Sequence, residues 1–217
     1  AELKRQFALC QEVCAALGVA RYGSSRYEAD DIIGTLTTRA RAAGLPVTIV
    51  SRDKDLTQLV SAADTYWDAI ADVRYGYDDI EERFGVVPER MADFLALMGD
   101  AVDNIPGVPG IGRKTAQTLL KHFGTLEGVL DNIEQIGKLK FRNATFVAAS
   151  LREHRETAVL SRRLPGIACD MPLPVSRISE LRLLPPVLST LDAFYDSQGF
   201  GRMLKDQARR VAASRRD

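Results

Sequence analysis

Seven carboxylates stand in three short groups along the first half of the chain, and their chemistry suits metal-ion binding. The groups are Glu28, Asp30 and Asp31, then Asp53 and Asp55, then Asp100 and Asp103. If they converge in one cleft, their mutual repulsion favours cations among them. Oxygen ligands select hard divalent ions such as Mg²⁺ or Mn²⁺. Two such ions about 3.5–4 Å apart support phosphoryl transfer, because they generate hydroxide and stabilise the leaving oxygen.

Each group also has a simpler explanation when taken alone. Acids at positions 28–31 precede a predicted helix, where capping and the helix dipole favour them. Asp53 and Asp55 follow a predicted strand and could belong to a polar loop. Asp100 follows the end of a helix and could cap the next turn. The metal hypothesis therefore depends on convergence, which spacing alone does not measure.

A glycine-rich hairpin follows the third acidic group and leads into a basic helix. Such a segment predicts backbone N–H groups that bind phosphate at a helix N-terminus. The spacing excludes a Walker loop, and no buried strand precedes the glycines as a dinucleotide site requires. A plain turn between helices is the alternative. The candidate DNA-binding residues are Gly107, Val108, Gly110, Ile111, Gly112, Arg113, Lys114 and Thr115.

Charge is distributed unevenly along the 217 residues, although the net charge is zero. Residues 1–105 carry 18 acids and 11 bases, whereas residues 106–217 carry 11 acids and 18 bases. Metals are therefore expected near the acids and DNA near the bases. Lys121, Lys138, Lys140 and Arg142 could extend a phosphate track. A basic cluster in the tail is interpreted as a solvated terminus: Arg202, Lys205, Arg209, Arg210, Arg215 and Arg216.

The elements that must position these residues follow from periodicity and capping. Residues 47–50 are apolar and β-branched, which predicts a parallel strand covered on both faces, and a short hairpin is expected around residues 69–77. The fold class is α/β, with a mostly parallel sheet flanked by helices over residues 1–100, followed by an all-helical region with a helix-hairpin-helix element over residues 101–217. Helices are predicted at about 7–17, 30–43, 78–84, 88–98, 113–123, 125–132 and 143–160, with two more in the tail.

A cytoplasmic protein without a membrane partner is expected, and it is expected to be monomeric. No run of 18 apolar residues and no signal peptide is visible. Cys10 and Cys14 lie on an apolar helical stripe and are expected to be reduced core residues. Because the chain opens inside a helical pattern with Ala1, we expect the natural protein to begin earlier.

Three motifs in order resemble the 5′-nuclease family, which comprises flap endonucleases and the 5′→3′ exonuclease domains of bacterial DNA polymerase I. YEADDIIGTL at 27–36 is similar to the family's E-A-D-D helix start. VSRDKDL at 50–56 is similar to V-S-G-D-K-D-L, and residues 99–115 are similar to G-D-x-x-D-N-I-P-G-V-x-G-I-G-x-K-T. Residues 181–201 are also similar to the end of the polymerase-type domain.

The resemblance implies a metal-dependent nuclease that cuts DNA at 5′ ends, flaps or duplex junctions in replication and repair. Glu28, Asp30 and Asp31 would bind the first metal ion, and the other four aspartates the second. The hairpin would be a helix-three-turn-helix element that grips duplex DNA and holds K⁺ through backbone carbonyls. Arg52 departs from the family pattern, which usually has glycine there. An earlier segment with the first central strand, further aspartates and a catalytic arch is not in these residues, so weak cleavage is expected.

Two rival functions follow from the same residues. A non-catalytic module could bind DNA junctions with the hairpin alone and take up no metal. A metal-dependent phosphatase of small substrates would use the carboxylates but not the hairpin.

Overall fold

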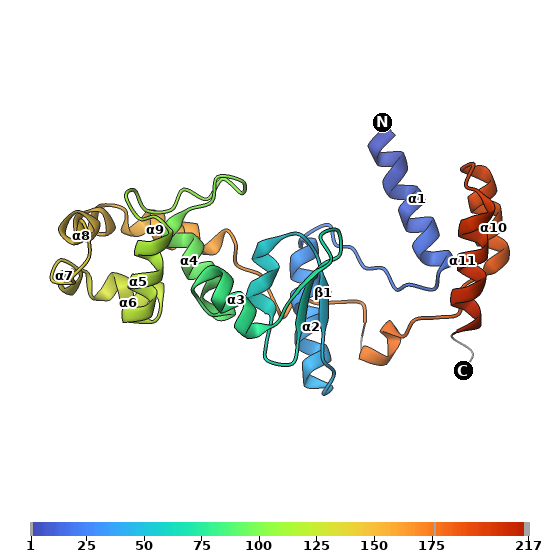
Figure 1. The fold of residues 1–217 in the computed structure, drawn as a ribbon, viewed down its shortest axis with the longest axis horizontal. Coiled ribbons are helices and arrows are strands. Elements are labelled where there is room, and N and C mark those ends of the chain that lie inside the picture. Colours follow the sequence, from blue (N-terminus) through green and yellow to red (C-terminus); the bar gives the residue numbers. More distant parts are fainter. Residues whose placement is uncertain (1, 176, 215–217) are drawn as a thin grey trace. The chain divides into compact units, whose positions relative to one another are not determined.

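The computed structural model describes residues 2–175 and 177–214, which form two compact units (Figure 1). Unit 1 combines Ala1–Ile32 with Pro172–Asp217, and unit 2 comprises Ile33–Met171. Arg215 and Arg216 of the predicted basic tail lie outside the described residues. Within the part that is described, no helix is long and apolar enough to cross a membrane.

Unit 2 begins with a small mixed sheet. Strand β1 (Thr48–Val50) pairs in parallel with β2 (Thr65–Asp68), and β2 pairs antiparallel with β3 (Val73–Tyr75). Ile49 lies opposite Tyr66, and both side chains are buried. They pack with Ile80 of helix α3 (Tyr77–Phe84) in one apolar cluster, which also holds the sheet against Ile33 of helix α2 (Ala29–Ala42).

The predicted strand at 47–50 is confirmed, but its environment differs from expectation. Only Ile49 is buried, whereas Thr48 and Val50 are exposed. The strand β1 is therefore covered on one face and not on both. The β2 strand was not predicted. Its residues T-Y-W-D mix polar and aromatic side chains, and parallel pairing with β1 is what orders them. The expected hairpin is the connection between β2 and β3.

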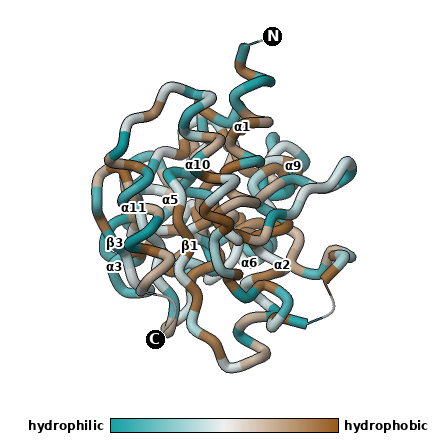
Figure 2. Tube along the Cα trace, turned by 90° about the vertical axis from the view of Figure 1, so that its right-hand side faces the viewer, coloured by the Kyte–Doolittle hydropathy of each residue, from teal (hydrophilic) through white to brown (hydrophobic). Residues whose placement is uncertain are grey.

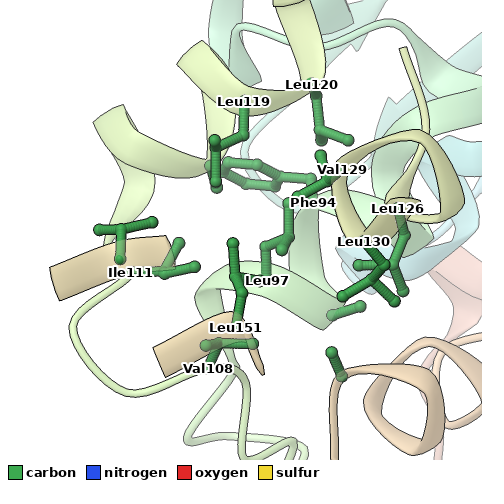
Figure 3. Close-up of a cluster of buried hydrophobic side chains, with 14 of the residues drawn as sticks. Phe94, Leu97, Val108, Ile111, Leu119, Leu120, Leu126, Val129, Leu130 and Leu151 are labelled. Atoms are coloured by element: carbon green, nitrogen blue, oxygen red, sulfur yellow. The ribbon is translucent and has the colours of Figure 1, made fainter. Parts of the chain in front are cut away.

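The rest of unit 2 is helical, as predicted, and surrounds helix α4 (Met91–Met98). Apart from Asp93, its residues are all apolar, which is typical of a helix enclosed by others. Phe94 and Leu97 of α4 contact the hairpin, α5 (Arg113–Phe123), α6 (Leu126–Asp131) and α8 (Ala144–Glu153) through one buried cluster (Figure 3). The remaining elements of this unit are the 3₁₀ turns η1 (Lys54–Leu59) and η2 (Pro88–Arg90), and helices α7 (Ile133–Ile136) and α9 (Arg155–Arg163).

The single long helix predicted at 143–160 is wrong. The chain breaks at His154 between α8 and α9, although no proline or glycine stands there. Each half has its own tertiary partner. Ser150 of α8 donates to the Pro109 carbonyl of the hairpin at 2.7 Å, whereas Arg162 of α9 pairs with the buried Asp93 of α4 at 2.5 Å. Because the two halves contact different elements, the hairpin and α4, their tertiary contacts favour a break in the helix that the local sequence does not indicate.

Unit 1 consists of helices α1 (Glu2–Ala16), α10 (Leu188–Ser197) and α11 (Arg202–Ala213), with the turn η3 (Ile178–Leu181). Hydrophobic and hydrophilic residues are mixed along these helices (Figure 2), and the buried core is small. The prediction that Cys10 and Cys14 are core residues is wrong: Cys10 is exposed and Cys14 half-buried, and neither forms a disulfide. Within α1, Ala16 at the C-terminal end is the one buried residue.

Candidate functional site

Asp53 and Asp55 lie at the start of η1, just beyond β1. The Asp53 carboxylate caps this 3₁₀ turn by accepting a hydrogen bond from the Asp55 amide at 3.0 Å. The Tyr66 hydroxyl of β2 donates to the Asp53 carbonyl at 3.0 Å and holds the same loop against the sheet. The cap directs Asp55 inward, where its residue is 9% exposed.

Asp100 and Asp103 lie in the turn after α4. Helix α4 ends at Gly99, whose φ of +77° suits glycine. Asp100 and Ile105 then exchange two backbone hydrogen bonds of 2.9 and 2.8 Å. The Asp100 carboxylate also accepts from the Val102 amide at 2.8 Å. This closed turn carries both carboxylates of the third acidic group.

Lys54 brings the two acidic groups together. Its ammonium nitrogen lies 2.5 Å from Asp100 Oδ2, 2.9 Å from Asp103 Oδ2 and 3.6 Å from Asp55 Oδ1. Burial lowers the Lys54 pKa, but the hydrogen bonds to Asp100 and Asp103 outweigh it and the pKa is raised. Burial also opposes ionisation of Asp100, yet its contacts with Lys54 and the Val102 amide lower its pKa. Three carboxylates thus converge on one cation.

Asp55 is the member of this group whose charge is least well compensated. Its Oδ1 atom is buried and has no hydrogen-bond partner. Burial raises its pKa to about 6, although Lys54 acts in the opposite direction. A buried carboxylate oxygen without a donor is costly, so such atoms call for a cation or a functional explanation.

The chemical type of these ligand atoms suits a hard divalent metal ion. They are carboxylate oxygens, one of them buried and unsatisfied, already gathered around positive charge. Among residues 2–175 and 177–214, however, no three His, Cys, Asp or Glu side chains are placed to hold a metal ion. Lys54 is the cation that these carboxylates contact in this structure. Sequence reasoning assigned it no role, although its place between Asp53 and Asp55 was a signal.

The first acidic group lies at the start of α2, in unit 1. The Asp31 carboxylate accepts from the Glu28 amide at 3.1 Å, which is a capping contact. Glu28 is exposed, and Asp30 and Asp31 are half-buried. In the structure, these acids therefore lie at a helix start and one of them makes a capping contact. That they bind metal ions together with the aspartates of unit 2 stays a prediction.

The glycine hairpin packs directly on the end of α4. The Val108 amide donates to the Leu97 carbonyl at 3.0 Å, and the Ile111 amide donates to the Val108 carbonyl at 3.0 Å. The side chains of Val108 and Ile111 are both buried. These two amides are already hydrogen-bonded, so the expectation of exposed amides along the whole hairpin does not hold for them. They anchor the hairpin in the core.

The amides open to an anion are those of the first turn of α5. The helix begins after Gly112, and its first N–H groups have no acceptor within the helix. Arg113 and Lys114 are exposed, and Thr115 is half-buried. The Arg113 guanidinium donates to the Arg83 carbonyl and lies 5.8 Å from the centre of the Phe84 ring. This helix start has the charge and the donors for a phosphate.

Gly107 joins the hairpin to the acidic turn. Its φ is +65°, and a Cβ there would lie 2.4 Å from the Gly99 nitrogen. Gly107 therefore lets the hairpin backbone pass directly against the residue before Asp100. The acidic turn and the hairpin that leads into the basic helix are thus packed directly against each other. Arg52, by contrast, is exposed and lies 3.7 Å from Asp68, so it points to a surface ion pair.

Comparison with known proteins assigns the class that this fold and site indicate. Residues 1–85 match the model of the 5′-3′ exonuclease N-terminal, resolvase-like domain, and residues 86–187 match that of the 5′-3′ exonuclease C-terminal SAM fold. The chain belongs to the 5′-3′ exonuclease family.

Relatives with curated names agree with this assignment. The chain is 45% identical over 179 residues to DNA polymerase I of Bacillus caldotenax, covering 81% of this chain and 20% of the polymerase. It is 38% identical over 164 residues to the 5′-3′ exonuclease of Buchnera aphidicola subsp. Acyrthosiphon pisum, covering 76% of this chain and 57% of that protein. The chain thus spans a fifth of the first relative and less than two thirds of the second.

Solved structures confirm the fold. The bacteriophage T5 D15 flap endonuclease in a pseudo-enzyme-product complex with DNA and metal ions matches with a TM-score of 0.61 at 20% identity, covering 98% of this chain and 66% of that one. The catalytic core of Rad2 in complex with DNA substrate matches with a TM-score of 0.57 at 16% identity, covering 95% and 69%. These likenesses support the helix-rich α/β architecture predicted from the sequence.

Proposed function

We propose that this protein is a metal-dependent 5′ nuclease that hydrolyses DNA phosphodiester bonds at 5′ ends, flaps or duplex junctions. The observation that carries the proposal is that Asp55, Asp100 and Asp103 converge on the ammonium group of Lys54. The turn that carries Asp100 and Asp103 also packs against the glycine hairpin, to which we assign phosphate binding. A phosphodiesterase needs both parts side by side, because metal and substrate phosphate must meet.

The carboxylates are assigned to the metal ions. Asp53, Asp55, Asp100 and Asp103 would hold one Mg²⁺ or Mn²⁺, and Glu28, Asp30 and Asp31 would hold another. When bound, such ions lower the pKa of water and stabilise charge on the phosphate. The buried oxygen of Asp55 that accepts no hydrogen bond supports this assignment, since a metal ion would coordinate it directly.

The hairpin and the start of α5 are assigned to the DNA backbone. The first-turn amides of α5 point away from the helix, and Arg113 and Lys114 add positive charge. Contacts of this kind hold phosphates in place without reading bases. A K⁺ ion on the hairpin carbonyls belongs to the same proposal, as does action by a cytoplasmic monomer in replication and repair. The relatives' names, DNA polymerase I and 5′-3′ exonuclease, support the action on DNA.

Cleavage of a 5′-flap duplex in Mg²⁺ tests the proposal, together with calorimetric titration of Mn²⁺. Asp53→Asn combined with Asp100→Asn is expected to abolish cleavage and to remove the Mn²⁺ site of Asp53, Asp55, Asp100 and Asp103. Asp78→Asn is the matched control, because Asp78 is an exposed acid at the start of α3. Cleavage that survives the double substitution would show that the metal assignment is wrong.

A non-catalytic DNA-junction binder is the second candidate. The observation that favours it is Lys54, which already neutralises the carboxylates. This candidate predicts duplex binding without uptake of Mn²⁺, so the same calorimetry separates the two. A phosphatase of small substrates would instead keep its activity in Lys114→Ala, since it has no use for the hairpin.

A further inference from the structure

The end of helix α3 is held by two side chains of helix α5. The last carbonyls of a helix have no donors within it, and α3 ends at Gly85, whose φ is +75°. The Arg113 guanidinium donates to the Arg83 carbonyl, and Gln117 Nε2 donates to the Phe84 carbonyl at 2.6 Å. Arg113 and Gln117 stand at i and i+4, so both donors come from one face of α5. The cap of α3 is thus supplied by another helix.

Aromatic rings and guanidinium groups alternate from the sheet to the start of α5. The Arg83 guanidinium carbon lies 5.0 Å from the centre of the Tyr75 ring, and its group also donates to the Tyr75 hydroxyl at 2.8 Å. The guanidinium carbons of Arg83 and Arg113 each lie 5.8 Å from the centre of the Phe84 ring. These separations are within the roughly 6 Å of a cation–π contact. Because Tyr75 belongs to β3 and Arg113 to the first turn of α5, the contacts connect these two elements.

Phe84 lies at the junction between the two apolar cores of unit 2. It packs against the core of the sheet, which includes Ile49 and Ile80, and also against the helical core, which includes Phe94 and Leu119. The first core supports the acidic turn at the start of η1, and the second supports the glycine hairpin and α5. The contacts of the two arginines with Phe84 therefore connect the part with the acids to the part with the basic helix start.

A direct contact of Arg113 with phosphate is the alternative role. The neighbouring Lys114 suits that role better, because it is exposed and its ammonium group forms no hydrogen bond or ion pair among the described residues. The Arg113 guanidinium is already engaged by the Arg83 carbonyl and the Phe84 ring. A planar guanidinium donates in fixed directions and stacks on rings, so such a contact sets an orientation that a lysine does not reproduce.

We propose that Arg113 is a positioning residue, which fixes the first turn of α5 relative to the sheet so that DNA backbone held there lies at a constant place relative to the acidic turn. The inference rests on the proposed function, because it takes the start of α5 as the phosphate contact. Arg113 acts through Arg83 and Phe84, and the direct contact is left to Lys114 and the helix amides. Placement matters because a displacement of about 1 Å can cost about 100-fold in rate.

Energy transfer from Trp67 tests this placement without metal or DNA. Trp67 is the single tryptophan of the sequence and lies in β2 of the sheet. An acceptor dye on Thr118→Cys, on the exposed face of α5, reports the distance from the sheet to the helix. The three native cysteines are replaced in the background chain so that only this position is labelled. Time-resolved fluorescence in EDTA then gives the width of the distance distribution.

The variants separate the geometry of Arg113 from its charge. Arg113→Met and Arg113→Lys should both widen the distribution, because lysine keeps the charge but lacks the planar group. Lys114→Met is the matched control, since it removes an equal charge from the next residue, and it should leave the width unchanged. Gln117→Met removes only the second donor to α3 and should also widen the distribution, so it serves if thermal melts show that Arg113→Met does not fold. An unchanged width in the variants that fold overturns the proposal.

Duplex binding in EDTA and cleavage in Mg²⁺ distinguish positioning from phosphate contact. Between 50 and 200 mM KCl, Lys114→Met should lower the slope of log K against log[salt] by about 0.9, the amount for one phosphate contact, and Arg113→Met by less. Arg113→Met should lower kcat on a 5′-flap duplex about 10- to 100-fold and leave KM near the parent value, because binding survives and placement does not. A slope lowered by about 0.9 in Arg113→Met with an unchanged width identifies a phosphate contact and overturns the proposal.

The two proposals fail in different ways. An unchanged width in Arg113→Met, with metal-dependent cleavage intact in the parent chain, removes the positioning role and leaves the nuclease. A widened distribution with an unchanged kcat also overturns the positioning role, because placement then has no effect on the reaction. A parent chain that neither cleaves nor takes up Mn²⁺ overturns the nuclease, and the width in EDTA still decides whether Arg113 fixes α5 against the sheet.

Discussion

The ammonium nitrogen of Lys54 lies 2.5 Å from Oδ2 of Asp100, and this contact joins the turn that follows β1 to the turn that follows α4. The same nitrogen reaches Asp103 at 2.9 Å. Two acidic groups that are distant in sequence therefore share one positive charge. In a metal-binding protein, such a lysine competes with the metal for the same oxygens.

Lys54→Met should make metal binding tighter and the metal-free protein less stable. The substitution removes the competing cation and leaves the carboxylates uncompensated. Lys54 is about one third exposed, so solvent screening limits the effect to about 1 kcal/mol, or roughly fivefold in affinity. Calorimetry with Mn²⁺ and thermal unfolding in EDTA measure the two changes. Lys54→Arg keeps the charge and is the control; weaker Mn²⁺ binding by Lys54→Met would contradict the prediction.

Asp55→Asn should stabilise the metal-free protein while it weakens metal binding. The native carboxylate is buried with an oxygen that accepts no hydrogen bond, and the 3.6 Å contact with Lys54 does not outweigh burial. Removal of its charge therefore relieves a desolvation cost on the order of 1 kcal/mol. A substitution that raises stability but lowers metal affinity indicates that the native residue serves function at the expense of stability. Chemical denaturation in EDTA and Mn²⁺ calorimetry give the two signs. Asp78→Asn, on the exposed start of α3, should leave Mn²⁺ binding unchanged and should not stabilise the protein, because the helix dipole favours an acid there. A loss of stability in Asp55→Asn refutes the idea.

Gly107→Ala should destabilise the protein, and Gly112→Ala should not. Alanine at 107 would need φ near +65° and would place its Cβ 2.4 Å from the Gly99 nitrogen, a backbone atom that cannot move aside. We expect a loss of at least about 1–3 kcal/mol. At Gly112 no atom lies within 4 Å of the added Cβ, and φ is −97°. Urea unfolding of both variants measures the difference, and equal losses would show that the close approach to Gly99 is unimportant.

Asp64 should make unfolding of unit 2 sensitive to acid. Burial opposes its ionisation, but hydrogen bonds from Ser61, the Arg41 side chain and the Val47 amide outweigh burial and lower its pKa. Because the folded pKa lies below the unfolded value of about 3.9, its contribution is complete above that pH and is lost as the pH falls through the folded pKa.

Comparison with Asp64→Asn measures this contribution. At pH 7 the variant should lose about 1.5–3 kcal/mol, the usual range for hydrogen bonds to a buried charged group. Below pH 4 the stability difference between the two proteins should shrink. Urea unfolding across pH 3 to 7 tests this, and a difference that stays constant down to pH 3 would show that the folded pKa is not the cause.

Local sequence was sufficient for several elements. Helix α5 occupies 113–123 as predicted, because glycines flank an amphipathic run at both ends. The helix at 29–42 and the strand at 48–50 also follow from short-range caps and periodicity. These features depend on residues within one or two turns, so the chain itself specifies them. The same holds for the three motifs that indicated the family.

Tertiary structure decided the rest. The break at His154, the pairing of β2 with β1 and the burial of Val108 and Ile111 all depend on partners distant in sequence. The contact of Asp55, Asp100 and Asp103 with Lys54 is of the same kind. Spacing showed that acids were present and lysine lay among them. Only the packing of α4 beneath the turn at 53–55 set which oxygens meet, because convergence is a property of the core and not of any single segment.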